Sequence, residues 1–99
     1  MLRIPLQAVP NQTLGVTLAR QTVNIALRQN GGSLYFDLAL GDESIVITRI
    51  CRDRQRLLLD AEYKGFQGEF IFVDTQGVDD PVWTGLDQRF ALLYLAVGE

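Results

Sequence analysis

The chain has 99 residues, with nine lysines and arginines against twelve aspartates and glutamates and a net charge of −3. A chain of this size is expected to form one domain over residues 1–99, and scattered basic residues in an acidic chain argue against nucleic-acid binding. The sequence has no histidine and one cysteine, Cys51. It therefore lacks the residues for a Ser-His-Asp or Cys-His catalytic system or a zinc site of the usual type.

Targeting and membrane segments have a recognisable length and apolar character. A signal peptide needs an apolar core of roughly 7–15 residues and a membrane-spanning helix needs roughly 18 apolar residues. The sequence contains neither pattern, so we expect a soluble protein made inside the cell. The single Cys51 cannot form an intrachain disulfide and is expected to be a small buried hydrophobic residue.

The first half of the chain has the alternating pattern of strands with one buried face. Residues 2–6 predict a short strand, which Pro5 places at a sheet edge because proline cannot donate to a ladder. Residues 14–18 and 21–29 predict two strands joined by a tight turn. The same alternation continues in residues 34–40, which predict a fourth strand.

Polar turns separate these strands from one another. Asn30, Gly31 and Gly32 tolerate positive φ and predict a short hairpin turn. Residues 41–43 predict the turn into a strand over residues 44–51. Because the isoleucines and the valine of this strand put apolar groups on both faces, we expect it to be central or covered on both sides.

The second half of the chain begins with an interruption of the apolar pattern by Arg52, Arg54 and Arg56. The run Leu57–Leu59 is short, which favours a strand over a helix. Residues 60–67 predict a loop or a broken strand.

Two further apolar runs, residues 70–73 and 90–95, predict the last strands. No segment has apolar residues at helical spacing over ten or more positions. Seven or eight short antiparallel strands predict an all-β fold, either a small β-sandwich or a partly closed β-barrel. Residues 90–95 are apolar on both faces, so this strand is either central or in contact with another chain; similar runs at 45–47 and 70–73 favour an assembly subunit over a monomer.

The loop between the last two strands holds the candidate site residues. Its aspartates could in principle bind Ca²⁺ or act as a paired acid and base, but their spacing does not match the calcium-loop pattern. Aspartate also suits turns, because it accepts hydrogen bonds from nearby backbone N–H groups. We expect no metal or cofactor, and an exposed ion pair of small energetic effect between Asp74 and Arg89. The residues expected to shape this loop or to contact a partner are Asp74, Asp80, Pro81, Trp83, Arg89 and Tyr94.

Trp83 has two interpretations. It either folds back over the sheet as a hydrophobic plug or projects as an anchor of an interface. In the alternative function, a free-standing β-rich module that binds a small molecule or a carbohydrate, Trp83 would be the stacking platform.

Three separate parts of the sequence follow one another in a recognisable order and spacing. They are Arg3-Ile4-Pro5-Leu6 with Val9-Pro10-Asn11-Gln12-Thr13, then Gly32-Ser-Leu-Tyr-Phe-Asp-Leu38, and then Val73-Asp74-Thr75-Gln76-Gly77 with Asp80-Pro81, Gly85-Leu86 and Arg89. This order and spacing resembles that of the small baseplate plug proteins of contractile-tailed bacteriophages. The likeness covers nearly the whole chain and is weakest over residues 51–59.

The resemblance implies a non-catalytic structural subunit at the central axis of the phage baseplate. The implied partners are hub, spike and tail-tube proteins, with the chain present as a homo-oligomer or in several copies. Neither nucleic acid nor membrane is an expected partner. The implied location is the tail baseplate of the virion, after synthesis in the cytoplasm of the host bacterium.

Overall fold

The computed structural model of the chain describes residues 2–18, 20–58 and 66–96. Seven strands and one short 3-10 helix form within these residues. Their bounds are β1 Leu2–Ile4, β2 Asn11–Leu18, β3 Gln21–Asn30, β4 Ser33–Leu40, β5 Glu43–Ile50, β6 Glu69–Asp74, η2 Trp83–Gly85 and β7 Phe90–Leu95.

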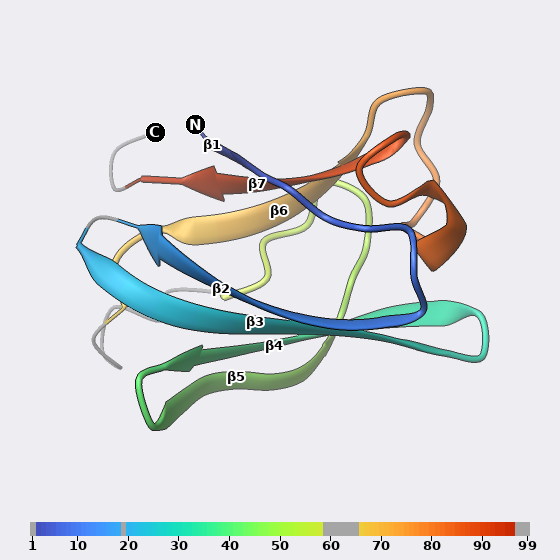
Figure 1. Cartoon of the computed structure of the whole chain (residues 1–99). Coiled ribbons are helices and arrows are strands. Elements are labelled where there is room, and N and C mark those ends of the chain that lie inside the picture. The colour runs from blue at the N-terminus through green and yellow to red at the C-terminus, as the bar shows by residue number, and fades with distance from the viewer. Residues whose placement is uncertain (1, 19, 59–65, 97–99) are drawn as a thin grey trace.

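The strands form two antiparallel sheets that face each other (Figure 1). The larger sheet has the order β2-β3-β4-β5 and the smaller has the order β1-β7-β6. Within the described residues the two sheets stay separate and do not close into a barrel. Of the two architectures that the sequence predicts, the β-sandwich is therefore confirmed.

Consecutive hairpins build the larger sheet, as the alternating pattern predicts. Asn30 pairs with Ser33 across the two glycines, and Gly31 takes the positive φ of 62° that the turn requires. β1 and β2 lie at sheet edges, and the predicted edge position of the strand before Pro5 is confirmed.

One hydrophobic core fills the space between the sheets. Phe36 of β4 and Phe70 of β6 meet across this space with their ring centroids 5.5 Å apart. The inward-facing residues of β3 and β4 are almost completely buried and are Val23, Ile25, Leu27, Leu34, Phe36 and Leu38. Since every second residue of these strands is buried, the period-two prediction is confirmed.

β7 lies between β1 and β6, so the prediction that an all-apolar strand could be central is confirmed. Phe90, Leu92 and Tyr94 face the core, whereas Leu93 and Leu95 on the opposite face are half-buried. Both apolar faces of β7 are therefore at least partly buried, and the outer face is not covered completely.

The prediction for β5 is wrong, because β5 is an edge strand and Ile47 is 68% exposed. Ile45 and Val46 are both buried although they are neighbours in sequence. The pairing of β5 with β4 is shifted here, and Thr48 has a positive φ of 54°. A bulge of this kind disrupts the alternation of side chains. Consecutive apolar residues in β5 can therefore lie on the same face, and they do not require both faces to be covered.

The connection from β5 to β6 crosses from one sheet to the other and covers the free edge of β6 (Figure 1). Single bridges join Asp53 and Arg56 to β6, and the Leu57 N–H donates to the carbonyl oxygen of Phe70 at 3.0 Å. The connection thus satisfies backbone groups that an edge strand would otherwise leave open.

The predicted strand over residues 57–59 is wrong for the two residues that the structure describes. Leu57 and Leu58 are buried but belong to no strand. Leu59 and most of the predicted loop over 60–67 lie outside the described residues, and Phe66 and Gln67 belong to no regular element.

Cys51 is free and buried, in agreement with its prediction as a small hydrophobic residue. Burial raises the pKa of its thiol, because the thiolate would lose its solvation. We therefore expect a chromogenic disulfide reagent at about pH 8 to modify the native chain at least ~100-fold more slowly than the chain in guanidinium chloride. Equal labelling rates in the two solutions would show that the thiol is accessible in the folded protein.

Candidate functional site

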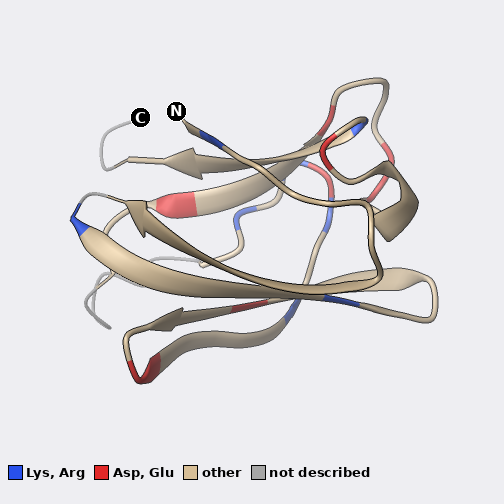
Figure 2. Cartoon of the chain, in the orientation of Figure 1, with Lys and Arg blue, Asp and Glu red and all other residues tan. Residues whose placement is uncertain are grey.

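The β6–β7 loop, residues 75–89, lies at one end of the sandwich, where acidic and basic residues gather (Figure 2). Its base is closed by backbone and side-chain hydrogen bonds to one carbonyl oxygen. The N–H and the hydroxyl of Thr75 donate to the carbonyl oxygen of Arg89 at 2.8 and 2.7 Å. The two ends of the loop are therefore held together.

Asp74, the last residue of β6, organises the loop from its base. Its carboxylate accepts from Nε and Nη2 of Arg89 at 2.8 and 2.7 Å. It also accepts from the backbone N–H groups of Gln76 and Asp79, each at 2.9 Å. One carboxylate thus fixes the start, the middle and the end of the loop.

The Asp74–Arg89 ion pair is the one that the sequence predicts, but the expectation of an exposed pair is wrong. The Asp74 side chain is completely covered, and Arg89 is one-third exposed. The Arg89 hydrogen bonds, opposed by burial and assisted by the two backbone N–H groups, hold the pKa of Asp74 well below its usual range. The same hydrogen bonds raise the pKa of the Arg89 guanidinium, so both groups are charged at neutral pH.

Arg89 also reaches a second carboxylate and an aromatic ring. Its Nη2 donates to Oδ2 of Asp79 at 2.7 Å, and its guanidinium carbon lies 5.1 Å from the ring centroid of Phe90. Planar guanidinium groups suit both contacts, and a lysine at this position could not make the two-point contact to Asp74.

Asp80 connects the loop to the segment before β6. Its Oδ1 accepts from the Asp53 N–H at 2.9 Å, and its Oδ2 lies 3.7 Å from Nη1 of Arg52. Oδ1 of Asp53 in turn accepts from the Asp74 N–H at 2.7 Å. Two aspartates therefore join the loop, β6 and the crossing segment.

The three arginines of the crossing segment each have an acidic partner. Arg54 pairs with Asp53 and donates to the carbonyl oxygen of Gly77 at 3.2 Å. Arg56 pairs with Glu69 at 3.1 Å. The sequence prediction missed Asp53 and these loop contacts, although alternating arginines in a chain with an acidic loop were a signal for them.

Pro81 is buried, and Trp83 is half-buried and packs against the hydrophobic core. The backbone N–H of Trp83 donates to Oε1 of Gln29 on β3 at 3.1 Å. The loop therefore folds back onto the larger sheet, and the Trp83 ring packs inward in the manner of a plug. The ring is therefore not a free surface on which a carbohydrate could stack.

Tyr94 lies apart from the loop, at the other end of β7. Its ring faces the core, 5.4 Å from the ring centroid of Phe70, and its hydroxyl donates to the carbonyl oxygen of Gln67 at 2.7 Å. The structure thus brings Asp74, Asp80 and Arg89 into one network and places Tyr94 outside it.

Asp74 and Asp79 share Arg89 as a donor, whereas the other carboxylates of the loop have separate donors. Asp87, for example, is bound by Arg3 of β1, which donates to its carbonyl oxygen at 2.6 Å and to Oδ1 at 3.3 Å. Within the described part of the chain, no group of three or more His, Cys, Asp or Glu side chains is placed to hold a metal ion. The hydrogen bonds and ion pairs of these carboxylates accordingly fix the shape of the loop.

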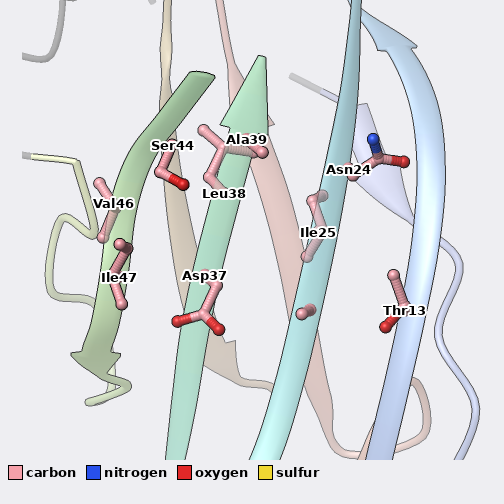
Figure 3. Close-up of a pocket in the computed structure, with 10 residues that line it drawn as sticks. Thr13, Asn24, Ile25, Asp37, Leu38, Ala39, Ser44, Val46 and Ile47 are labelled. Atoms are coloured by element: carbon pink, nitrogen blue, oxygen red, sulfur yellow. The ribbon is translucent and has the colours of Figure 1, made fainter. Parts of the chain in front are cut away.

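A shallow hollow of about 260 Å³ lies on the outer face of the larger sheet (Figure 3). Small side chains such as Thr13, Ala39 and Ser44 line it, with Ile47 at the β5 side. Its one charged residue, Asp37, already accepts from the Thr48 N–H and pairs with Arg28. The hollow is therefore lined by a mixture of small polar and aliphatic side chains, and its one carboxylate is already bound.

Fold and loop together define a small structural β-sandwich whose polar side chains hold one loop in a fixed shape. In comparison with known protein families, residues 1–97 match the family described as cyanophage baseplate Pam3 plug gp18. The chain belongs to this family of phage baseplate plug proteins, and the resemblance stated above is confirmed. No curated protein matches the chain significantly.

Membership of the family defines the coarse function. The chain is a structural protein of a bacteriophage baseplate, located in the tail of the virion, and it interacts with other baseplate proteins. No helix in the described residues is long and apolar enough to cross a membrane.

Proposed function

We propose that the chain is a non-catalytic subunit at the central axis of the baseplate, where it links the tail tube to the hub and the spike. The paired polar groups of the β6–β7 loop carry this proposal, because they give the loop one shape to present to a neighbour. Made in the host cytoplasm, the chain would enter the tail in several copies, as a single domain over residues 1–99. Its net charge of −3 supports protein rather than nucleic-acid partners.

The exposed side chains of the loop suit contact with proteins. Val78 is 80% exposed and Val82 is 37% exposed, on a loop that is otherwise fixed from below by Asp74. An apolar side chain on a preorganised loop can enter a partner's pocket without a large cost in conformational entropy. The loop end of the sandwich is therefore the surface that we assign to the baseplate partners.

Co-expression with hub, spike and tail-tube proteins of the same phage tests this assignment. We expect the tagged chain to retain at least one of them, and Val78→Asp to weaken that binding by about tenfold or more. Ile47→Asp is the matched control, because Ile47 is similarly exposed but lies on β5, away from the loop. Binding to none of the three proteins, or an equal loss with both variants, would contradict the proposal.

A further inference from the structure

Among the residues that the structure describes, the two sheets have four edge strands, and three of these strands carry a feature that prevents further pairing. β1 has three residues and is followed by Pro5, and residues 53–57 cover β6. A bulge with positive φ at Thr48 interrupts β5. Proteins commonly protect edges by such short strands, bulges and covering segments. β2 is different: it pairs with β3 in continuous register over eight residues.

The outer side of β2 presents a regular row of backbone donors and acceptors. The Gln29 N–H donates to the carbonyl oxygen of Pro10 at 2.8 Å, which fixes this pair as hydrogen-bonded. Since such pairs alternate along an antiparallel ladder, the even-numbered residues of β2 bond to β3 and the odd-numbered residues direct their groups away from it. The outward-directed residues are Asn11, Thr13, Gly15 and Thr17.

The side chains of β2 add no barrier to a further strand. No charged residue and no proline occurs between Asn11 and Leu18. The outward-directed residues Thr13, Gly15 and Thr17 are exposed and small, whereas Leu14 and Val16 are only half-buried against the core. An added strand would complete the cover of the two aliphatic side chains.

We propose that β2 pairs with β2 of a second copy, antiparallel about a two-fold axis at Gly15, so that two four-stranded sheets become one. This refines the multi-copy part of the proposed function. In this register Thr13 faces the partner's Thr17, and Leu14 faces the partner's Val16 on the core side. Each outward-directed pair exchanges two backbone hydrogen bonds.

A second copy fits this edge because the strand is complementary to itself. Threonine pairs and aliphatic pairs across neighbouring strands are favourable, and no like charges face each other in the proposed register. The two glycines at the axis carry no side chains to collide. A two-fold arrangement also closes after two copies and leaves no open end for growth at this edge.

A charge exchange at positions 13 and 17 tests the pairing and its register together. One variant carries Thr13→Lys and Thr17→Lys, and the other carries Thr13→Glu and Thr17→Glu. Position 13 of one copy faces position 17 of the other, so each variant alone opposes like charges, whereas the mixture opposes unlike ones. By sedimentation equilibrium at about 100 μM we expect wild type to be dimeric, each variant alone to be monomeric and the equimolar mixture to be dimeric. The two variants should associate with each other at least about tenfold more tightly than either variant associates with itself.

Thr22→Lys is the matched control, because Thr22 is exposed on the same face but lies on β3, opposite Thr17. It should dimerise like wild type. Circular dichroism checks the folding of each variant. If a charged variant is unfolded, Thr13→Pro is tested in its place, because it removes an outward N–H and no β2–β3 hydrogen bond. In the wild-type dimer the amides of Thr13, Gly15 and Thr17 should be protected from hydrogen exchange.

A wild-type chain that stays monomeric up to about 0.5 mM would overturn the proposal. So would a lysine variant that dimerises like wild type, because its dimer would use another surface. Neither result affects binding of hub, spike or tail-tube proteins through the loop, so failure of this inference is distinguishable from failure of the proposed function.

Discussion

Asp74→Asn is expected to lower the melting temperature of the chain by about 10 °C or more at neutral pH. The buried carboxylate accepts from two atoms of Arg89 and two backbone N–H groups. An asparagine side chain has an NH₂ group in place of one carboxylate oxygen, so this group would face the N–H donors that the oxygen now accepts from. The substitution would also leave the Arg89 guanidinium without its buried counter-charge. Thermal unfolding followed by circular dichroism measures the effect.

The same carboxylate makes the stability of the chain depend on pH. Its pKa in the folded chain is lower than the value of about 3.9 expected after unfolding. Its stabilisation is therefore complete above about pH 5 and is lost as the pH falls further toward the folded-state pKa. We expect the wild-type melting temperature to fall steeply below about pH 4 and that of Asp74→Asn to fall less.

Asp42→Asn serves as the control for both measurements, because Asp42 is an exposed turn residue before β5. Its melting temperature should remain within about 3 °C of wild type. Parallel pH curves for wild type and Asp74→Asn would contradict the role assigned to the buried carboxylate.

Gly68→Ala is expected to reduce the free energy of unfolding by about 3 kcal/mol or more. Gly68 has a φ of 111°, and an added Cβ would lie 2.5 Å from Cε1 and 2.6 Å from the hydroxyl oxygen of Tyr94. The Tyr94 ring is buried between aromatic neighbours and its hydroxyl is bound to Gln67, so it cannot move aside without cost. Urea denaturation measures the change.

Two other glycines separate the causes of this effect. Gly31 has a positive φ of 62° with open space around it, and Gly32 has open space without a positive φ. We expect Gly31→Ala to cost about 1–2 kcal/mol and Gly32→Ala to have an effect within about 1 kcal/mol. If Gly68→Ala were no worse than Gly31→Ala, the contact with Tyr94 would not be the dominant cause.

The larger sheet was predictable because its information is local. Val23, Ile25 and Leu27 alternate with residues of the other face, and the glycines at 31 and 32 mark the next turn. The edge position of β5 was not predictable in this way. Its bulge places Ile45 and Val46 on the buried side together, and a hydrophobic pattern alone does not distinguish that from two covered faces.

The loop network was predictable only in its simplest part. Asp74 and Arg89 stand at the two ends of the loop with opposite charges, so their pairing could be expected. The burial of that pair depends on the whole surrounding fold, as does the contact of Asp53 with Asp80. Contacts between segments more than twenty residues apart leave no periodic trace in the sequence.

The pairing of β1 with β7 places the first and last strands of the chain side by side, with Leu2 opposite Tyr94 and Ile4 opposite Leu92. The hairpins over residues 11–50 need only local contacts, whereas this pairing closes a loop of almost the whole chain, and such closures are slow. During translation, the smaller sheet cannot be completed until β7 has left the ribosome. Until then we expect the apolar face of the larger sheet to have no permanent cover, and exposed apolar surface of this kind favours aggregation.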